Sequence, residues 1–399
     1  MPDWSRRDVV VGFGAAATLG GGYYLAERPF CRPRHDPQWT YDGEYWGPAV
    51  ASEYGLLVPE GYSATGGGPY RLVALDRSRG QARWATVARG GGFGVPAVHE
   101  GTVYVGTGVD TVRAHDATTG RLRWEYDAGG VEEHGGGAWG RPLVTDGRVY
   151  AGVSHAANPD ADPTDGDAFT HRVVALDADD GGERWSHEVT TQVWTGPVGV
   201  AGVVVVGSVG GVLRGFDPES GDVRWTATLP GTVRRRPVVV GDTVTVVTGD
   251  GTVTSVDAAT GAKRDSTRAV ETAGERRAAT AVASHRGTVY VGGQSGRVVA
   301  LTSAPAASEW PVRWTFDTGV PVGAIAAGEA GVFVVDHSGR LHALTDDGER
   351  RQHVGLVETR GDRCEWRPDR RFVRSAVLEG ERLTVSTNWW TRRFGVRDL

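Results

Sequence analysis

Tryptophan and arginine side chains that recur close to prolines are the residues of this chain best suited to chemistry. Trp139 and Trp194 each stand three residues before a proline, and Arg141 and Arg236 each stand directly before one. A rigid aromatic ring beside a guanidinium is what an anionic, peptide or glycan ligand needs. The alternative is structural, with rings that fill gaps and arginines that are solvated or paired with aspartates. The candidate binding residues are Trp46, Phe93, Trp139, Arg141, Trp194, Arg235, Arg236, Arg374, Trp389 and Trp390.

Acidic and histidine residues offer a second kind of chemistry. Oxygen-rich loops suit calcium, but the spacing of Asp160, Asp162, Asp165 and Asp167 departs from the D-x-[DN]-x-[DN]-G loop and favours a solvated insertion. Nothing in the spacing requires residues 132–134 to converge with the scattered histidines His155, His171 and His187. The sequence also lacks a G-x-S-x-G elbow, an H-E-x-x-H motif and a phosphate-binding P-loop. We therefore predict neither a catalytic residue nor a metal ligand.

Two cysteines, Cys31 and Cys364, are the only thiols in the chain. A disulfide between them would tie the start of the chain to its end, and two unpaired thiols are the alternative. A lipid on Cys31 is a third possibility, although residues 28–30 in front of it make a poor lipidation box. Two lone cysteines do not form a metal site.

Charge and composition exclude several classes of protein. The 399 residues include 43 Lys plus Arg and 49 Asp plus Glu, so the net charge of −6 argues against nucleic-acid binding. Glycine accounts for 60 residues, about twice the usual share, but no G-x-y period is present. Apolar residues spread along the chain argue against disorder. The composition therefore indicates a globular fold that is rich in turns.

The amino terminus resembles an export signal. Arg6 and Arg7 precede a weakly hydrophobic run to about Ala26, an arrangement similar to a twin-arginine translocation signal. The run is barely long enough to span a bilayer, and it leaves open whether the segment is cleaved or stays as a single membrane anchor. We expect the rest of the chain to lie outside the cytoplasm, secreted or attached to the membrane surface.

A repeated phrase is the main feature of the sequence. Residues 114–124 read A-x-D-x-x-T-G-x-x-x-W, and variants of the phrase lie at 74–84, 175–185, 215–225 and 255–265, where Asp265 takes the place of the tryptophan. Trp84 to Trp124, Trp185 to Trp225 and Trp225 to Asp265 are each separated by 40 residues. A fixed period of this length is typical of solenoids and propellers.

Each period reads as two hairpins. Runs such as residues 96–106 carry Val and Tyr on both sides of a short Gly turn, and the repeated phrase forms a second hairpin with its D-x-x-T-G turn. Four antiparallel strands of about 40 residues, arranged radially, make a β-propeller blade. The inner strands predict eight blades, with the tryptophan of each outer strand packed against the next blade.

The last blade lacks room for its fourth strand. It has a hairpin from Ala376 to Ser386 and a third strand near residues 394–398. The missing strand is at the other end of the chain, where residues 38–42 match the fourth strands at 123–127 and 313–317. We therefore predict an all-β, eight-bladed propeller of four-stranded antiparallel blades, closed by the N-terminal strand near Trp39.

The chain is thus expected to hold a signal or anchor at residues 1–27, a linker at 28–37 and one propeller at 38–399. Two kinds of connection, from a fourth strand to the next first strand and from a second to a third strand, emerge on one face, called here the funnel face. The candidate aromatic and arginine residues fall in these connections. Trp389 and Trp390 are expected in the second-to-third connection of the last blade.

The repeated phrase resembles the tryptophan docking motif of the PQQ-binding-like repeat superfamily. That superfamily includes quinoprotein alcohol dehydrogenases and the propeller lipoprotein of the outer-membrane β-barrel assembly machine. The resemblance covers about residues 38–399 and implies the propeller fold. For the dehydrogenases it also implies PQQ, a calcium ion, a catalytic Asp and a disulfide between adjacent cysteines. This chain has no adjacent cysteine pair, and no position matches the catalytic Asp.

These observations favour an exported, non-catalytic, monomeric scaffold. It is expected to bind an envelope or cell-surface protein or polymer through the funnel face, without a cofactor and without nucleic acid. The alternative is a quinoprotein oxidoreductase that depends on PQQ and calcium. A fold by itself does not decide between these functions.

Overall fold

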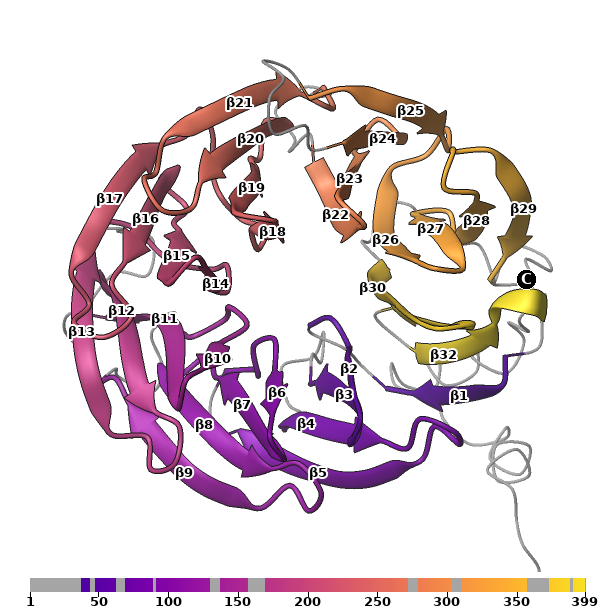
Figure 1. Cartoon of the computed structure of the whole chain (residues 1–399). Coiled ribbons are helices and arrows are strands. Elements are labelled where there is room, and N and C mark those ends of the chain that lie inside the picture. Colours follow the sequence, from indigo (N-terminus) through magenta and orange to yellow (C-terminus); the bar gives the residue numbers. More distant parts are fainter. Residues whose placement is uncertain are drawn as a thin grey trace, which may run out of the picture.

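The computed structural model describes residues 37–43, 47–61, 69–88, 91–129, 137–156, 169–271, 279–302, 310–356, 373–387 and 390–398. Its strands form eight four-stranded antiparallel sheets, which are arranged as blades in a ring around a central axis (Figure 1). The predicted all-β, eight-bladed propeller is therefore confirmed. Within the described residues, no helix is both long enough and apolar enough to cross a membrane.

Blades 1 to 4 follow one another along the chain. Blade 1 holds β2 (Val50–Ser52), β3 (Gly55–Glu60), β4 (Tyr70–Leu75) and β5 (Ala82–Ala88). Blade 2 holds β6 (Ala97–His99), β7 (Thr102–Gly106), β8 (Thr111–Asp116) and β9 (Leu122–Asp127). Blade 3 holds β10 (Leu143–Thr145), β11 (Arg148–Ala156), β12 (Phe169–Asp177) and β13 (Glu183–Val189). Blade 4 holds β14 (Val198–Val200), β15 (Val203–Gly207), β16 (Val212–Phe216) and β17 (Val223–Thr228).

Blades 5 to 8 complete the ring. Blade 5 holds β18 (Val238–Val240), β19 (Thr243–Val247), β20 (Thr252–Asp257) and β21 (Lys263–Arg268). Blade 6 holds β22 (Ala279–His285), β23 (Thr288–Gly293), β24 (Arg297–Thr302) and β25 (Val312–Asp317). Blade 7 holds β26 (Val322–Gly328), β27 (Gly331–Asp336), β28 (Arg340–Leu344) and β29 (Arg350–Gly355). Blade 8 holds β30 (Val373–Glu379), β31 (Arg382–Thr387), β32 (Trp390–Gly395) and β1 (Trp39–Asp42), and η3 (Val396–Asp398) follows β32.

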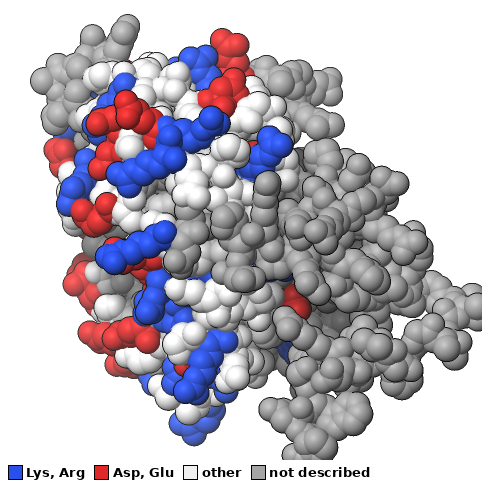
Figure 2. All heavy atoms as spheres, turned by 90° about the vertical axis from the view of Figure 1, so that its right-hand side faces the viewer, with Lys and Arg blue, Asp and Glu red and all other residues white. Residues whose placement is uncertain are grey.

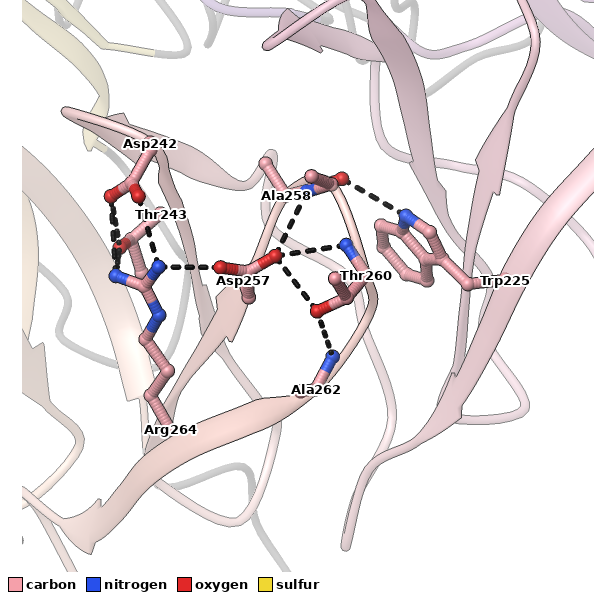
Figure 3. Close-up of polar contacts among 9 residues, drawn as sticks. Trp225, Asp242, Thr243, Asp257, Ala258, Thr260, Ala262 and Arg264 are labelled. Carbon is pink, nitrogen blue, oxygen red and sulfur yellow. Dashed lines mark hydrogen bonds and ion pairs between the residues drawn. The ribbon is translucent and has the colours of Figure 1, made fainter.

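A turn of the pattern D-x-x-x-G closes the outer hairpin of blades 1 to 5, with the glycine N–H bonded to the aspartate carbonyl. In blade 5, one carboxylate oxygen of Asp257 accepts hydrogen bonds from the backbone N–H groups of Ala259 (3.1 Å) and Thr260 (2.8 Å) and from the Thr260 hydroxyl (2.8 Å) (Figure 3). Its other oxygen pairs with Arg264. These donors, the Thr260 hydroxyl first, lower the pKa of Asp257 to about 2. The turn is therefore held by an ionised aspartate at neutral pH.

The outer tryptophan of one blade docks on this turn in the next blade. The Trp225 indole N–H donates to the Ala258 carbonyl at 2.9 Å (Figure 3), and its ring lies where a Cβ on Gly261 would stand. A left-handed glycine is needed there both for its φ of +74° and for the close approach of the ring. The same N–H bond to the following blade is made by Trp39, Trp84, Trp124, Trp185 and Trp314.

Two blades carry another residue at the docking position. Asp265 pairs with Ser255 in the register that Trp225 has with Gly215, which confirms its place in the phrase. Gln352 stands at the equivalent point of blade 7, opposite Ala343. The periodic contact between blades is therefore supplemented by apolar clusters between the sheets. One such cluster joins blades 7 and 8 through Phe333, Leu341, Leu383, Trp390 and Phe394.

Strand β1 closes the ring as predicted. It pairs antiparallel with β32, with Trp39 opposite Arg393, at the point where the two ends of the described chain meet (Figure 1). The buried Arg393 guanidinium ion-pairs with Glu379, donates to the Arg77 carbonyl and lies 5.7 Å from the centre of the Trp39 ring. Glu379 also ion-pairs with Arg77 of blade 1. Strand pairing thus completes blade 8, and the Trp39 ring together with the Arg77 contacts ties blade 8 to blade 1.

The third strand of blade 8 lies earlier than expected. It spans Trp390–Gly395, and residues 396–398 form η3 rather than a strand. Trp390 therefore begins a strand and does not lie in a connection, because its backbone is opposite Asp42 of β1. The sequence near residues 388–393 is polar and aromatic without a turn signal, so its boundary was not readable from the pattern.

The outer surface carries charges of both signs. On the side of the ring that Figure 2 shows, acidic and basic side chains intermingle across the described residues. Ion pairs between a turn aspartate and an outer-strand arginine recur, as in Asp116–Arg123 (2.7 Å) and Asp217–Arg224 (2.6 Å). Exposed pairs of this kind contribute little to stability individually. They place charges of opposite sign next to each other on the outer hairpins of blades 2 and 4 as well.

Candidate functional site

The funnel face is built from two sets of connections that bond to each other. The Gly108 amide, in the β7–β8 connection, donates to the Gly92 carbonyl ahead of β6 at 2.8 Å, and the Gly249 amide donates to the Thr232 carbonyl at 2.9 Å. The fourth-to-first and second-to-third connections therefore lie on one face, as the topology required. The prolines at 96, 142, 197 and 237 precede the inner strands β6, β10, β14 and β18.

Several residues singled out from the sequence lie outside the described residues. Among the binding candidates these are Trp46 and Trp389. The acidic residues Asp160, Asp162, Asp165 and Asp167, residues 132–134 and both cysteines, Cys31 and Cys364, are outside as well. The remaining candidates fall into buried, half-buried and exposed groups.

Phe93 and Trp390 are buried and pack between blades. Phe93 has no exposed surface and contacts an apolar cluster with Leu57 and Val103. Trp390 is 8% exposed, with the Arg392 guanidinium 4.3 Å from its ring centre. Burial is the main cause of a lowered Arg392 pKa of about 10. Both rings fill gaps, so they are not available to a partner in this structure.

Trp194 is the exposed aromatic residue of the candidate set. Its ring is 38% exposed, and the Arg234 guanidinium lies over it at 4.5 Å from the ring centre. The neighbouring Arg235 is exposed and donates to the Thr280 carbonyl of blade 6. The cation–π attraction holds a guanidinium over the face of an indole ring and leaves the edges of the ring open to solvent. This pair has the exposure and rigidity of a binding anchor.

Arg141 and Arg236 approach each other from blades 3 and 5. Arg236 donates to the Pro197 carbonyl of blade 4 through Nη2 (2.9 Å) and Nε (3.3 Å). Although Arg236 reaches solvent, desolvation by the surrounding protein and, to a smaller extent, the nearby charge of Arg141 together lower its pKa to about 10. Burial also lowers the pKa of Arg141. The two cations stay protonated at neutral pH, and neither forms an ion pair with a described residue.

Trp139 and Arg374 are half-buried. The Trp139 ring lies where Cβ atoms on Gly108 and Gly137 would stand, so it covers the connections of blade 2. Arg374 lies at the irregularity in the pairing of β30 with β31, between Val373 and Ser375. Each has contacts with neighbouring residues. Both side chains therefore contribute to the packing of the funnel face, and only part of each reaches solvent.

A buried aspartate, Asp110, adds an ionisable group that the sequence did not reveal. It stands in the β7–β8 connection at φ +63°, is 2% exposed, and its Oδ1 has no hydrogen-bond partner among the described residues. Burial raises its pKa to about 7; the Gly137 N–H acts in the opposite direction, and the charge of Asp127 adds to the increase. Its positive φ favours Asp, Asn or Gly, but the sequence gives no sign of the burial.

The Asp110 carboxyl should make stability depend on pH. Its pKa is higher in the folded state than in the unfolded state, so the free energy of unfolding should fall as pH rises from about 4 to about 7. An Asp110→Asn variant is expected to be more stable than the native chain by about 1–2 kcal/mol at pH 8 and nearly equal to it at pH 5. Urea unfolding at both pH values tests this. The exposed Asp346→Asn is the control, and equal differences at the two pH values would contradict the assignment.

Histidines gather on the long hairpin of blade 3 without forming a metal site. His171 Nδ1 lies 3.0 Å from the Ser154 hydroxyl, directly across the strand pair, and both side chains are buried. Burial lowers the pKa of His155 and of His171. His187 instead packs edge-on against Phe216. In the part of the chain that the structure describes, no three His, Cys, Asp or Glu side chains converge as metal ligands.

The sequence reasoning missed Arg234. It is the first of three consecutive arginines and occupies the position, three residues before the proline, that Phe93, Trp139 and Trp194 hold in other blades. Aligning the blades by their prolines would have placed it beside the preceding blade's aromatic residue. The position of Arg234 relative to the proline of its repeat was therefore enough to identify it.

Sequence comparison identifies relatives. Residues 36–192 and 169–311 match the profile of the PQQ_2 family, described as outer membrane protein assembly factor BamB. An outer membrane protein assembly factor BamB of Nitrosomonas eutropha is 31% identical over 130 residues, which make up 33% of this chain and 32% of that protein. The match thus spans about a third of the length of this curated relative.

Solved structures share the fold. BamB from Moraxella catarrhalis has a TM-score of 0.61 at 15% identity, covering 91% of this chain and 97% of that one. A quinohemoprotein alcohol dehydrogenase from Comamonas testosteroni has a TM-score of 0.65 at 14% identity, covering 90% and 76%. The computationally designed Ika8 protein has a TM-score of 0.64 at 14% identity, covering 90% and 99%. At these identities the likeness concerns the fold alone.

Proposed function

The chain belongs to the PQQ_2 family of outer membrane protein assembly factors, and from this premise we propose that it is a non-catalytic envelope scaffold that binds a partner protein through its funnel face. The partner class is a protein of outer-membrane assembly, because the Nitrosomonas relative carries that description. Export through the twin-arginine-like segment at Arg6 and Arg7 is part of the same proposal.

The exposed Trp194–Arg234 pair is the observation that carries the proposal. Interface anchors are typically Trp, Tyr and Arg side chains held rigidly and partly desolvated. Trp194 keeps 38% of its surface exposed although it is a large aromatic residue, and Arg234 fixes its ring at 4.5 Å. Arg235 adds an exposed cation beside the pair. The face therefore offers an apolar plate flanked by positive charge, which suits a partner surface with an aromatic or aliphatic side chain next to a carboxylate.

Replacing Trp194 by alanine is expected to weaken binding of purified outer-membrane assembly proteins at least tenfold, with little change in melting temperature. The measurement is a dissociation constant by surface plasmon resonance. Val312→Ala is the matched control, because Val312 is 55% exposed but lies on the outer strand β25. Unchanged affinity in Trp194→Ala and in Arg234→Gln would contradict binding through this part of the funnel face.

An experiment with the cofactor, on the same protein, distinguishes the quinoprotein alternative from the scaffold proposal. The calcium site implied by the resemblance needs converging oxygen ligands, and the described residues present no such group of three acidic or histidine side chains. If addition of PQQ and calcium shifted the quinone absorption and gave dye reduction by alcohols, the non-catalytic proposal would be wrong.

A further inference from the structure

A hollow lies among the inner strands of four consecutive blades. It has a volume of 310 Å³, at the small end of the range for ligand pockets. Strands β10, β14, β18 and β22 are the innermost strands of these blades (Figure 1). The lining residues are Leu143, Val198, Gly199, Arg236, Pro237, Val238, Val239 and Ser284.

Gly199 of blade 4 makes room for the hollow. Pairing of the inner strands aligns Leu143, Val198 and Val238 as equivalent residues of blades 3, 4 and 5. The next residue in each blade is Val144, Gly199 and Val239, of which Val239 is 40% exposed. Blade 4 therefore presents no side chain at a level where both its neighbours present valine. The lining around this gap is largely aliphatic.

Arg236 brings a positive charge to the lining of the hollow, and the charge of Arg141 acts on Arg236 from nearby. At the residue before the proline, blades 3, 4 and 5 carry Arg141, Gly196 and Arg236. A Cβ at Gly196 would stand 2.0 Å from the Arg141 carbonyl oxygen, so only glycine permits this approach of the two connections. Arg236 uses Nε and Nη2 on the Pro197 carbonyl, which leaves Nη1 without a partner among the described residues. None of the lining residues is acidic.

We propose that this hollow binds a carboxylate carried on a small apolar body, with the carboxylate between Arg236 and Arg141 and the apolar part against Leu143, Val198 and Val239. A guanidinium that lacks an anionic partner gains a charge-assisted hydrogen bond from a carboxylate. The aliphatic lining gains from removing apolar surface from water. Such a ligand is either a free small acid or the C-terminus of a peptide that ends in an aliphatic residue. Only the peptide source rests on the proposed scaffold function.

The test compares 4-methylpentanoate with 4-methylpentanamide, which has the same size but no charge. Saturation-transfer NMR on the full chain is expected to show binding of the acid and at least tenfold weaker binding of the amide. Arg236→Gln should weaken binding of the acid at least tenfold, and Arg236→Lys should retain part of it. The exposed Arg121→Gln, on an outer turn, should bind the acid like the native chain.

Gly199→Val tests the shape of the hollow while leaving its charge intact. The backbone of Gly199 is not in the left-handed region, and a Cβ there meets only the end of the Leu143 side chain at 3.3 Å. The variant should fold normally, since blades 3 and 5 already carry valine at this level, and it should lose binding of the acid. Equal binding of acid and amide, absence of binding, or unchanged binding in Gly199→Val would each overturn the proposal.

Two peptides distinguish the sources of the carboxylate. A peptide ending in leucine with a free carboxylate is compared with the same peptide as its C-terminal amide. Preference for the free carboxylate supports a peptide ligand, whereas binding of 4-methylpentanoate without the peptide supports a small free acid. If neither binds while Trp194→Ala still weakens partner binding, the hollow proposal fails and the scaffold function stands.

Discussion

A Trp39→Ala variant is expected to lose about 3–5 kcal/mol of unfolding free energy and to open the ring. Trp39 is 6% exposed, donates its indole N–H to the Arg77 carbonyl at 3.0 Å, and lies on Gly80 of blade 1. Trp39 belongs to β1, the strand that completes blade 8, so the loss is concentrated at the closure of the ring. The Arg393–Glu379 pair beside it would also gain solvent. Removal of the ring therefore weakens packing and charge pairing together.

Urea unfolding measures the change, and hydrogen exchange locates it. Amides of β1 and β32 should exchange faster in Trp39→Ala, while those of blade 4 should change less. Trp39→Phe is the intermediate variant, since it keeps an aromatic ring but removes the N–H bond and part of the buried ring volume, and it should lose about 1–3 kcal/mol, less than Trp39→Ala. If Trp39→Ala unfolded at the same urea concentration as the native chain, strand β1 would not be the closing element.

Gly221→Ala is expected to cost about 2–5 kcal/mol, the second large effect. Gly221 has a φ of +77°, where an alanine is strained by about 1–2 kcal/mol. A Cβ there would also stand 2.6 Å from the Trp185 ring, and overpacking of this kind costs about 1–3 kcal/mol more. The Trp185 indole would have to leave the Pro218 carbonyl to which it now donates at 3.0 Å.

Gly202→Ala separates the two causes. Gly202 has a φ of +69°, but nothing lies within 4 Å of a Cβ at that position. This variant should therefore show only the backbone strain, about 1–2 kcal/mol. Thermal and urea unfolding of the two variants gives the difference directly. Equal losses would mean that the ring does not require the glycine and that the turn alone selected it.

The fold could be predicted from the sequence because the residues that determine it are close together in the chain and recur in each repeat. Asp257, Thr260 and Gly261 form one turn within five residues, and the tryptophan that docks on it lies one period earlier. The closing strand was recognisable because residues 38–42 resemble other fourth strands. Even the exception at Asp265 kept its register.

The candidate site was only partly readable. Phe93 and Trp194 hold equivalent positions in the repeat, yet one is fully buried and the other is 38% exposed. Their surroundings differ because Phe93 packs against Leu57 and Val103, whereas Trp194 packs against Arg234. Burial depends on the neighbouring blade and not on the residue's own segment. Asp110 could not be identified from the sequence for the same reason, since its pKa is raised by burial among the surrounding connections.

The sequence by itself determined the propeller, its number of blades and its closure, because turn residues, strand alternation and docking tryptophans act within a segment or on its neighbour. Only the tertiary structure decided which of the equivalent positions meet at the hollow. Leu143, Gly199 and Arg236 belong to three different blades, and the ring brings them together as the lining of one hollow. These residues come together because the whole ring curves and excludes solvent at this point. A single repeat has neither property.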